Sequence, residues 1–388
     1  MVSARLRIVV IVAFFLLIVP VSAKPPATVW YYYHDYERLM DELLKLRTQH
    51  PDLISLTTLG TSTRGRTIPL IALTNQTKTH AERAVLFTGA VHGSEVVGTE
   101  AILTFLATTL EQYAHNVTFR ELVGSTIIYL IPMLNPDGVE AGKMTDDYRL
   151  ARRNAAGVDL NRNFPWKWKL AGSNSTSSYE YHGSKPLSEP ESASLYNFVN
   201  SHKLNIILNC HSGLSPRLIY PSGSANGTLY NTMARTIYAL TGYDYITGGE
   251  NGSIPTWAYW NTSAHPLSFE LEIYNNSGVS PSSANWWYHY NPDNNELLTK
   301  VKAVSELLHY LTIQNIPRTE SHTPNNTATS LRTTLPQVSG PTNVSTPQIA
   351  LLTAIATVVS AALIMSARRA KRVGTAHGRS KFKLHFPH

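Results

Sequence analysis

The sequence has almost no cysteine and few charged residues. Cys210 is its single cysteine, so an intrachain disulfide is excluded, and 15% of the 388 residues are charged. Without cross-links the chain must rely on a hydrophobic core, and roughly 280 globular residues are enough for a large one. Cys210 directly precedes His211, which makes it a candidate ligand or nucleophile. The simpler interpretation is a small buried residue that ends a strand.

Acidic residues are missing from both ends of the chain. Residues 1–23 combine two arginines, an apolar stretch and small final residues, a pattern typical of a secretory signal peptide, with a retained N-terminal anchor as the alternative. Residues 349–367 carry no charge, would span about 28 Å as a helix, and precede a basic tail at 368–388. We therefore expect a single-pass protein of the cell membrane, with its main domain extracellular and its tail cytoplasmic.

This topology accounts for the net charge of +7. Nine of the 33 basic residues lie in the two ends, which leaves 24 basic against 26 acidic residues in the remainder. The excess of positive charge thus belongs to the membrane topology, and the composition gives no reason to expect a nucleic-acid partner.

The segment between the main domain and the apolar stretch has its own composition. Residues 316–348 are rich in Ser, Thr, Pro and Asn, and such a segment cannot form a core, so it is interpreted as a stalk. Asn-x-Ser/Thr sequons agree with export and predict a glycoprotein; they begin at Asn75, Asn116, Asn174, Asn226, Asn251, Asn261, Asn275, Asn325 and Asn343.

Residues 24–315 alternate short apolar runs with helical patterns. The stretch 36–51 has leucines at helical spacing before a proline, and 96–113 and 189–202 are further helix candidates. The runs "AVLFTGAV", "STIIYLIPML", "NIILNC" and "SFELEI" are typical of buried strands. The alternation predicts one α/β domain with helices on both faces of a sheet.

Histidines and an acid follow two of these strands. His92 and Glu95 come after the first run, with Gly93 between them to let the backbone bend, and His211 ends a later run. Zinc binds imidazole nitrogen and carboxylate oxygen, and a catalytic zinc takes three protein ligands. Because sheets present the carboxyl ends of their strands to a crevice, the three residues form a candidate metal site.

The order of several motifs resembles that of zinc carboxypeptidases of the A/B type. The motifs are "HGSE", "LNPDG", "RLARRN", "GVDLNRNFP", "HGSKPLSEPES", "CHSG" with "YPSG", and "SFELE", and they span roughly Tyr33 to Leu311. The resemblance implies a single domain with a mixed, mostly parallel eight-stranded sheet flanked by helices. It also implies one zinc ion and removal of a C-terminal residue from a peptide or protein substrate.

The resemblance gives roles to individual residues. His92, Glu95 and His211 match the zinc ligands, and Asp159 matches the acid that orients the first histidine, although a turn or cap role for Asp159 stays open. Asn161 and Arg162 match the residues that hold the substrate's terminal carboxylate in this family.

Two further residues match the catalytic groups. Arg152 matches the arginine that polarises the scissile carbonyl, with Arg149 and Arg153 as rivals along the chain. Glu270 matches the general base that activates water, and Glu272 stays a rival because the two-residue period of a strand puts both on one side.

Substrate selection is the least specified feature. Tyr245 is the expected match for the mobile tyrosine that closes over the carboxylate, with Tyr243 nearby, and Ile254 is expected to set the pocket for the terminal side chain. Ile254 would favour large apolar termini. Ser94 stands where digestive-type members of the family carry an arginine. This difference predicts weaker contacts to the substrate residue upstream of the cleaved bond, or a weaker secondary contact to the substrate carboxylate.

The resulting prediction is a membrane-anchored, extracellular zinc carboxypeptidase. A hydrolase of cell-wall peptides or an amino-acid deacylase of the same fold is the first alternative. A catalytically silent binding protein is the second, and it would be expected to lack a ligand or the base.

Overall fold

The computed structural model describes residues 33–77, 83–223, 227–283 and 285–314. The predicted signal peptide, stalk, transmembrane helix and tail lie outside this part. None of the helices within it is both long and apolar enough to cross a bilayer.

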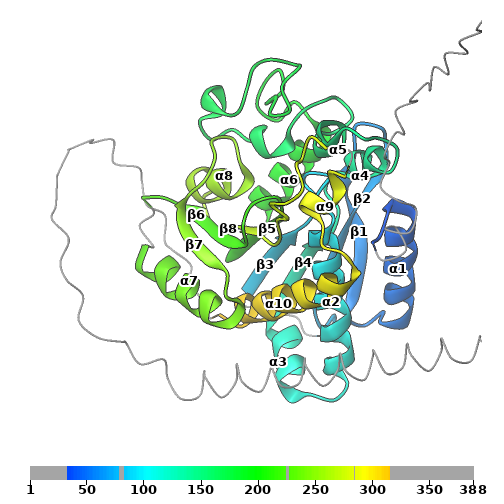
Figure 1. Cartoon of the computed structure of the whole chain (residues 1–388). Coiled ribbons are helices and arrows are strands. Elements are labelled where there is room, and N and C mark those ends of the chain that lie inside the picture. Colours follow the sequence, from blue (N-terminus) through cyan, green and yellow to red (C-terminus); the bar gives the residue numbers. More distant parts are fainter. Residues whose placement is uncertain (1–32, 78–82, 224–226, 284, 315–388) are drawn as a thin grey trace, which may run out of the picture.

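One eight-stranded sheet forms the centre of the fold, as the resemblance implied (Figure 1). Its strands lie in the order β1-β2-β4-β3-β5-β8-β6-β7. The pairs β3/β4, β3/β5, β5/β8 and β6/β7 are parallel, and β1/β2, β2/β4 and β6/β8 are antiparallel. The strands are β1 Ile54–Thr61, β2 Thr67–Leu73, β3 Arg83–Thr88, β4 Thr126–Ile131, β5 Ile206–His211, β6 Arg217–Pro221, β7 Asp244–Gly248 and β8 Leu267–Glu272.

Helices pack on both faces of this sheet, which confirms the predicted α/β class. The longer ones are α1 Tyr36–Gln49, α2 Val97–Tyr113, α6 Pro190–Ser201, α7 Gly227–Thr241 and α10 Asn294–Ile313. The shorter ones are α3 Val117–Ser125, α4 Pro136–Gly142, α5 Tyr148–Arg152, α8 Ile254–Asn261, α9 Trp287–Tyr290 and the 3₁₀ turns η2 Leu160–Arg162 and η3 Trp168–Leu170.

The alternation of side chains along the strands divides the core in two. In β3, Val85 and Phe87 join the cluster formed with α1, α2, α7 and α10, whereas Leu86 points to the cluster formed with α6 and α8. The same division occurs in β5, where Ile206 and Ile207 face opposite sides. Central strands buried on both faces explain why their sequences are continuous apolar runs.

Parallel pairing brings the functional residues together. Strands β3, β5 and β8 run in the same direction, so their carboxyl ends meet at one edge of the sheet. His92 lies just after β3, His211 ends β5, and Glu270 and Glu272 lie at the carboxyl end of β8. This edge is the place where sheets of this kind form binding crevices.

Candidate metal centre and substrate cavity

A tight turn after β3 presents His92 and Glu95. The backbone N–H of Glu95 donates to the carbonyl oxygen of His92 at 3.0 Å. Gly93 serves close packing, because a Cβ at this position would lie 2.2 Å from backbone atoms of Gly138 and Val139 in α4. The φ angle of Gly93 is not positive, so this position does not require glycine for a left-handed backbone.

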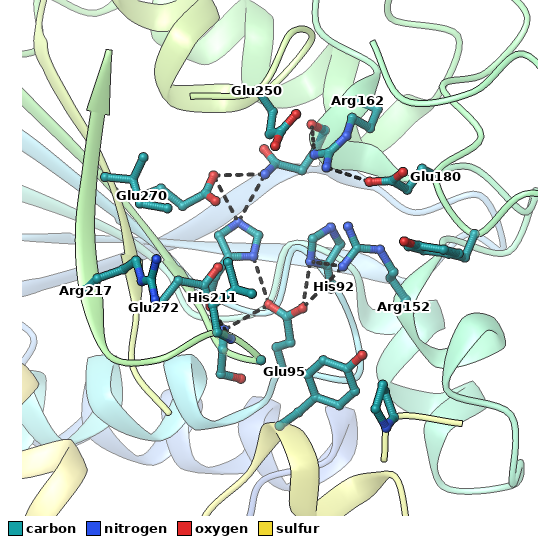
Figure 2. Close-up of a pocket in the computed structure, with 18 of the residues that line it drawn as sticks. His92, Glu95, Arg152, Arg162, Glu180, His211, Arg217, Glu250, Glu270 and Glu272 are labelled. Atoms are coloured by element: carbon teal, nitrogen blue, oxygen red, sulfur yellow. Dashed lines mark hydrogen bonds and ion pairs between the residues drawn. The ribbon is translucent and has the colours of Figure 1, made fainter. Parts of the chain in front are cut away.

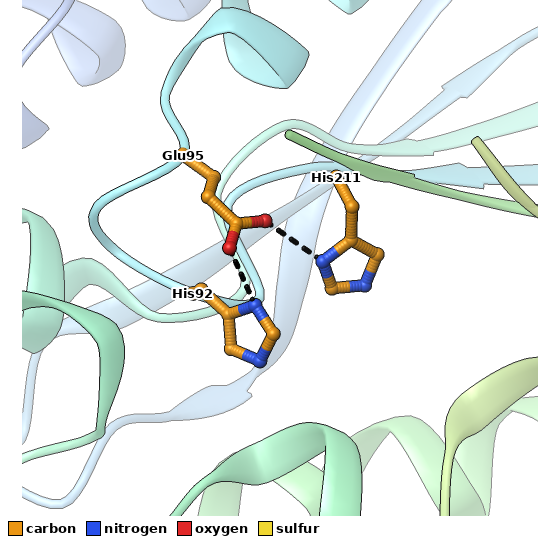
Figure 3. Close-up of side chains that lie close together, drawn as sticks. All are labelled: His92, Glu95 and His211. Carbon is orange, nitrogen blue, oxygen red and sulfur yellow. Dashed lines mark hydrogen bonds and ion pairs between the residues drawn. The ribbon is translucent and has the colours of Figure 1, made fainter. Parts of the chain in front are cut away.

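Three buried side chains converge on one point (Figure 3). Glu95 lies between the two histidines, with Oε1 2.9 Å from Nδ1 of His92 and Oε2 2.8 Å from Nδ1 of His211. Ligand atoms of the three residues all lie within 4.8 Å of one another. The structure thus brings together the three residues that the sequence predicted to bind a metal.

Asp159 holds the far side of the first histidine. Its Oδ1 accepts a hydrogen bond from Nε2 of His92 at 3.0 Å, which leaves the lone pair of Nδ1 pointing at the centre of the triad. Burial would raise the pKa of Asp159, but the charges of Arg152 and His92 outweigh it and hold this pKa well below its ordinary value. Asp159 is therefore an anion that fixes the tautomer of His92.

The charges of the triad suit a cation. Burial opposes ionisation of Glu95, yet the imidazoles of His92 and His211 lower its pKa. Burial would likewise lower the pKa of His211, but the carboxylates of Glu270 and Glu95 raise it to about 9. Positive charge on His211 thus faces the anion of Glu95 at the place where a divalent ion would lie. Two imidazole nitrogens and a carboxylate oxygen are donors that zinc uses, so these residues fit zinc.

Arg152 reaches the same centre from α5. Its Nε and Nη2 donate to Oδ2 of Asp159 at 3.1 and 2.7 Å. Its Nη1 lies 3.2 Å from Nδ1 of His92 (Figure 2). The rivals lie elsewhere: Arg149 pairs with Asp147 in solvent, and Arg153 donates to backbone carbonyls. Of the three arginines in "RLARR", Arg152 is therefore the one placed at the triad.

Asn161 and Arg162 enter the cavity from the turn η2. The side-chain Nδ2 of Asn161 donates to Oε2 of Glu270 at 3.0 Å, and its Oδ1 accepts the N–H of Ile254 at 3.0 Å. Arg162 is buried, and its Nη2 donates to Oε1 of Glu180 at 2.9 Å. Both predicted carboxylate-binding residues thus line one cavity of about 620 Å³ with the metal triad.

Residues 39–323 match the family model described as zinc carboxypeptidase. The chain belongs to the zinc carboxypeptidase family. This membership confirms the resemblance to zinc carboxypeptidases, and the His92–Glu95–His211 triad is a group of residues that could hold the family's zinc ion.

Three individual proteins show how similar this chain is to known carboxypeptidases. The carboxypeptidase N catalytic chain of Rattus norvegicus is 32% identical over 202 residues, 46% of this chain and 42% of the relative. A zinc carboxypeptidase of Saccharothrix mutabilis subsp. capreolus is 36% identical over 146 residues, 36% of this chain and 34% of the relative. The chain spans less than half the length of these two proteins. The crystal structure of carboxypeptidase A from Helicoverpa armigera shares the fold, with a TM-score of 0.59 at 22% identity over 72% of this chain and 73% of that one.

The two acids of β8 both line the cavity of this zinc carboxypeptidase homologue. Oε2 of Glu270 lies 3.7 Å from Nε2 of His211, and its side chain is 14% exposed. Glu272 is more deeply buried and accepts the N–H of Leu214 at 3.3 Å. Burial and the charge of Glu95 raise the pKa of Glu272 to about 8. Glu270 is therefore the more open of the two.

Tyr245 and Ile254 are not brought to the cavity. Tyr245 lies on β7 with its ring centroid 6.5 Å from that of Tyr238 in α7. Ile254 is fully buried in the core beneath α8 and contributes only its backbone N–H to Asn161. On the β6–β7 side of the sheet the cavity is lined instead by Ile219 and Ile246.

Several lining residues were missed by the sequence reasoning. Three tyrosines and three charged residues lie here without belonging to any motif: Tyr148, Tyr179, Tyr290, Glu180, Arg217 and Glu250. Alternation along β6 and β7 would have placed Arg217 and Ile219 on one face. The tyrosines and Glu180 lie in irregular segments or very short helices, for which no periodic signal exists.

Proposed function

We propose that this chain is a zinc carboxypeptidase that hydrolyses the C-terminal peptide bond of peptides or proteins. The observation that carries the proposal is the shared cavity: the His92–Glu95–His211 triad lies in the same cavity as Arg162. A metal triad alone would suit many hydrolases. A buried arginine beside it suits a substrate that ends in a carboxylate.

Zinc, when bound, supplies a Lewis acid and lowers the pKa of a water molecule. His92, Glu95 and His211 are the residues that hold it, and Asp159 orients His92. The remaining groups act on the substrate. Arg162 and Asn161 bind the terminal carboxylate, which restricts cleavage to the last peptide bond because an internal bond offers no such group.

Arg152 is proposed to polarise the scissile carbonyl. Two of its nitrogens are held by Asp159, so the guanidinium is fixed while Nη1 points toward the triad. A donor fixed in this way stabilises negative charge on the carbonyl oxygen without reorganising, and removal of such a donor typically costs about 3–4 kcal/mol of barrier lowering.

Glu270 is proposed as the general base. It accepts a proton from the attacking water and passes it to the leaving amine, as a carboxylate at the cavity wall can do. Its partner Asn161 Nδ2 holds the carboxylate toward His211. The deeper position and raised pKa of Glu272 favour a protonated, structural carboxyl there.

The membrane anchoring and orientation of the enzyme are also proposals. We infer an outward-facing enzyme anchored by residues 349–367, supported by the uncharged stretch, the basic tail and the sequons. Fractionation of cells that express the full chain should recover it with membranes after a carbonate wash. External protease should remove the main domain from intact cells; a protected domain would contradict the orientation.

The activity is tested on the purified full chain. It should release the last amino acid from N-blocked dipeptides, lose this activity with a chelator, and regain it with zinc. The same peptides with an amidated C-terminus are the matched control. Equal cleavage of the amides, or cleavage of internal bonds alone, would exclude the exopeptidase assignment and leave a hydrolase of another bond.

A further inference from the structure

The guanidinium of Arg162 already has a carboxylate partner in this chain. Its Nη2 donates to Oε1 of Glu180 at 2.9 Å, and both side chains line the cavity of the metal triad (Figure 2). The Arg162 side chain is 8% exposed, whereas that of Glu180 is 33% exposed. The pair therefore joins a fixed arginine to an acid that solvent can reach.

Nη2 is the nitrogen of Arg162 that a carboxylate needs for bidentate binding. A guanidinium binds both oxygens of a carboxylate along its Nη1–Nη2 end or along its Nε–Nη2 side, and Nη2 belongs to both edges. In Arg162, Nη1 donates to the carbonyl oxygen of Asn161 at 3.1 Å, and the buried Nε has no hydrogen-bond partner among the described residues. A carboxylate that binds Arg162 in this way therefore meets Glu180 at the same nitrogen.

The main chain fixes the place of Glu180. The N–H of Ser173 donates to the carbonyl oxygen of Glu180 at 2.9 Å, and Ser173 forms a β-bridge with Tyr181. Gly172, with φ of +42°, permits the close approach: a Cβ there would lie 2.4 Å from the carbonyl oxygen of Glu180 and 3.1 Å from Cγ of Arg162. The contact is thus built into the path of the backbone.

We propose that Glu180 is an internal competitor for the substrate's terminal carboxylate at Arg162. The inference rests on the proposed function and adds a residue that sets substrate affinity. When a ligand carboxylate takes Nη2, the side chain of Glu180 turns toward solvent; when the ligand leaves, Glu180 returns. Only hydrogen bonds are exchanged. The apparent dissociation constant then equals the intrinsic one divided by the fraction of molecules in which Glu180 is displaced.

This competition lowers the affinity of every ligand that takes Nη2 by the same factor. An arginine–carboxylate pair of intermediate exposure lowers apparent affinity by about three- to tenfold. A lone carboxylate has only Arg162 with which to overcome Glu180. A peptide end that is also held by Asn161 and Arg152 has a lower intrinsic dissociation constant, so after the same loss of affinity it still occupies the site at concentrations at which a weakly bound free carboxylate does not.

Removal of the Glu180 charge should therefore tighten binding. Isothermal titration of the zinc-supplied full chain with 3-phenylpropanoate, which cannot be turned over, should give a three- to tenfold lower Kd for Glu180→Gln than for the unchanged protein. Glu180→Ala should behave alike, and thermal melting checks that both variants fold. Glu250→Gln is the control for charge alone, because Glu250 lines the same cavity and its charge also acts on Arg162, but no ion pair joins the two side chains in the described structure. It should lower Kd less than Glu180→Gln does, because it removes a nearby charge without freeing Nη2 of Arg162.

Other results would overturn the inference. Unchanged or weaker binding by both Glu180 variants would show that Glu180 does not compete, and an equal effect of Glu250→Gln would reduce it to a general charge effect. A titration with 4-guanidinobutanoate separates the remaining role: weaker binding of this cationic ligand alone would make Glu180 a receptor for basic side chains. Since these titrations need no turnover, their outcome is independent of the carboxypeptidase assay. Where turnover is measured, Glu180→Gln should lower KM and leave kcat unchanged.

Discussion

A buried histidine away from the cavity should make the stability of this protein depend on pH. His309 lies in α10, with its ring centroid 4.5 Å from Phe105 and 5.1 Å from Phe119. Its Nδ1 donates to the carbonyl oxygen of Ser305 at 2.8 Å, and its Nε2 faces the hydroxyl of Thr109 at 3.0 Å. Burial lowers the pKa of His309 to about 3. The folded protein therefore keeps this ring neutral.

The sign and size of the effect follow from linkage. An unfolded chain protonates the histidine near its ordinary pKa of 6.5, so below that pH the unfolded state binds more protons and is favoured. The contribution of His309 is fully present above pH 6.5 and is lost as the pH falls toward 3. At pH 5 the loss amounts to about 2 kcal/mol, and at pH 4 to about 3 kcal/mol.

His309→Phe removes the titration and keeps an aromatic ring between Phe105 and Phe119. Thr109 keeps a partner in this variant, because its hydroxyl also lies 2.7 Å from the carbonyl oxygen of Phe105. Urea unfolding of both proteins at pH 8, 7, 6 and 5, with a chelator throughout, should show that the difference in unfolding free energy shifts by about 2 kcal/mol in favour of the variant between pH 8 and pH 5. Parallel curves would refute the reasoning, since they would mean that His309 titrates alike in both states.

Three predictions concern the cavity. Glu270→Gln should retain zinc, as measured by metal analysis, but lower kcat by about 10²- to 10⁴-fold, and the same loss in Glu272→Gln instead would transfer the role of base. Asp159→Asn should weaken zinc binding by about 10- to 100-fold in a competition titration, and unchanged affinity would leave Asp159 a turn residue. Arg162→Lys keeps the charge without the planar fork, so kcat/KM for free C-termini should fall by about 10- to 100-fold while amidated peptides stay unaffected. An equal loss on both would mean that Arg162 is structural.

The four central strands, β4, β3, β5 and β8, and the residues of the metal triad could be predicted from the sequence because each depends on a local pattern. Apolar runs mark the strands, and residues that follow parallel strands must meet at one edge, so His92 and His211 converge although 119 positions separate them. The two-residue repeat of a strand also placed Glu270 and Glu272 correctly on the same side of β8. The difference in their burial, which the sequence does not give, distinguishes the two.

Irregular segments form much of the cavity wall, and the sequence did not predict which of their residues line it. Tyr245 lies on the edge strand β7, both faces of which carry exposed residues, so the strand's pattern of apolar residues does not indicate which face meets the cavity. Ile254 begins a helix, and its side chain turns into the core while its backbone N–H serves Asn161. Glu180 reaches Arg162 through a loop path that requires Gly172, a long-range contact that no local periodicity indicates.

Asp159 connects parts of the site that have separate roles. Its Oδ1 accepts from His92 and from the N–H of Asn161, its Oδ2 accepts twice from Arg152, and its own N–H donates to the carbonyl oxygen of Tyr181, the residue after Glu180. Loss of its charge should therefore act on several steps together. Because Arg152 would lose an anionic partner and Asn161 would keep an amide-oxygen acceptor, Asp159→Asn should impair carbonyl polarisation, seen in kcat, more than carboxylate binding, seen in KM, even when zinc is saturating. A change confined to zinc affinity would instead mean that Arg152 is held by packing, with Tyr179 at 5.7 Å as the remaining support.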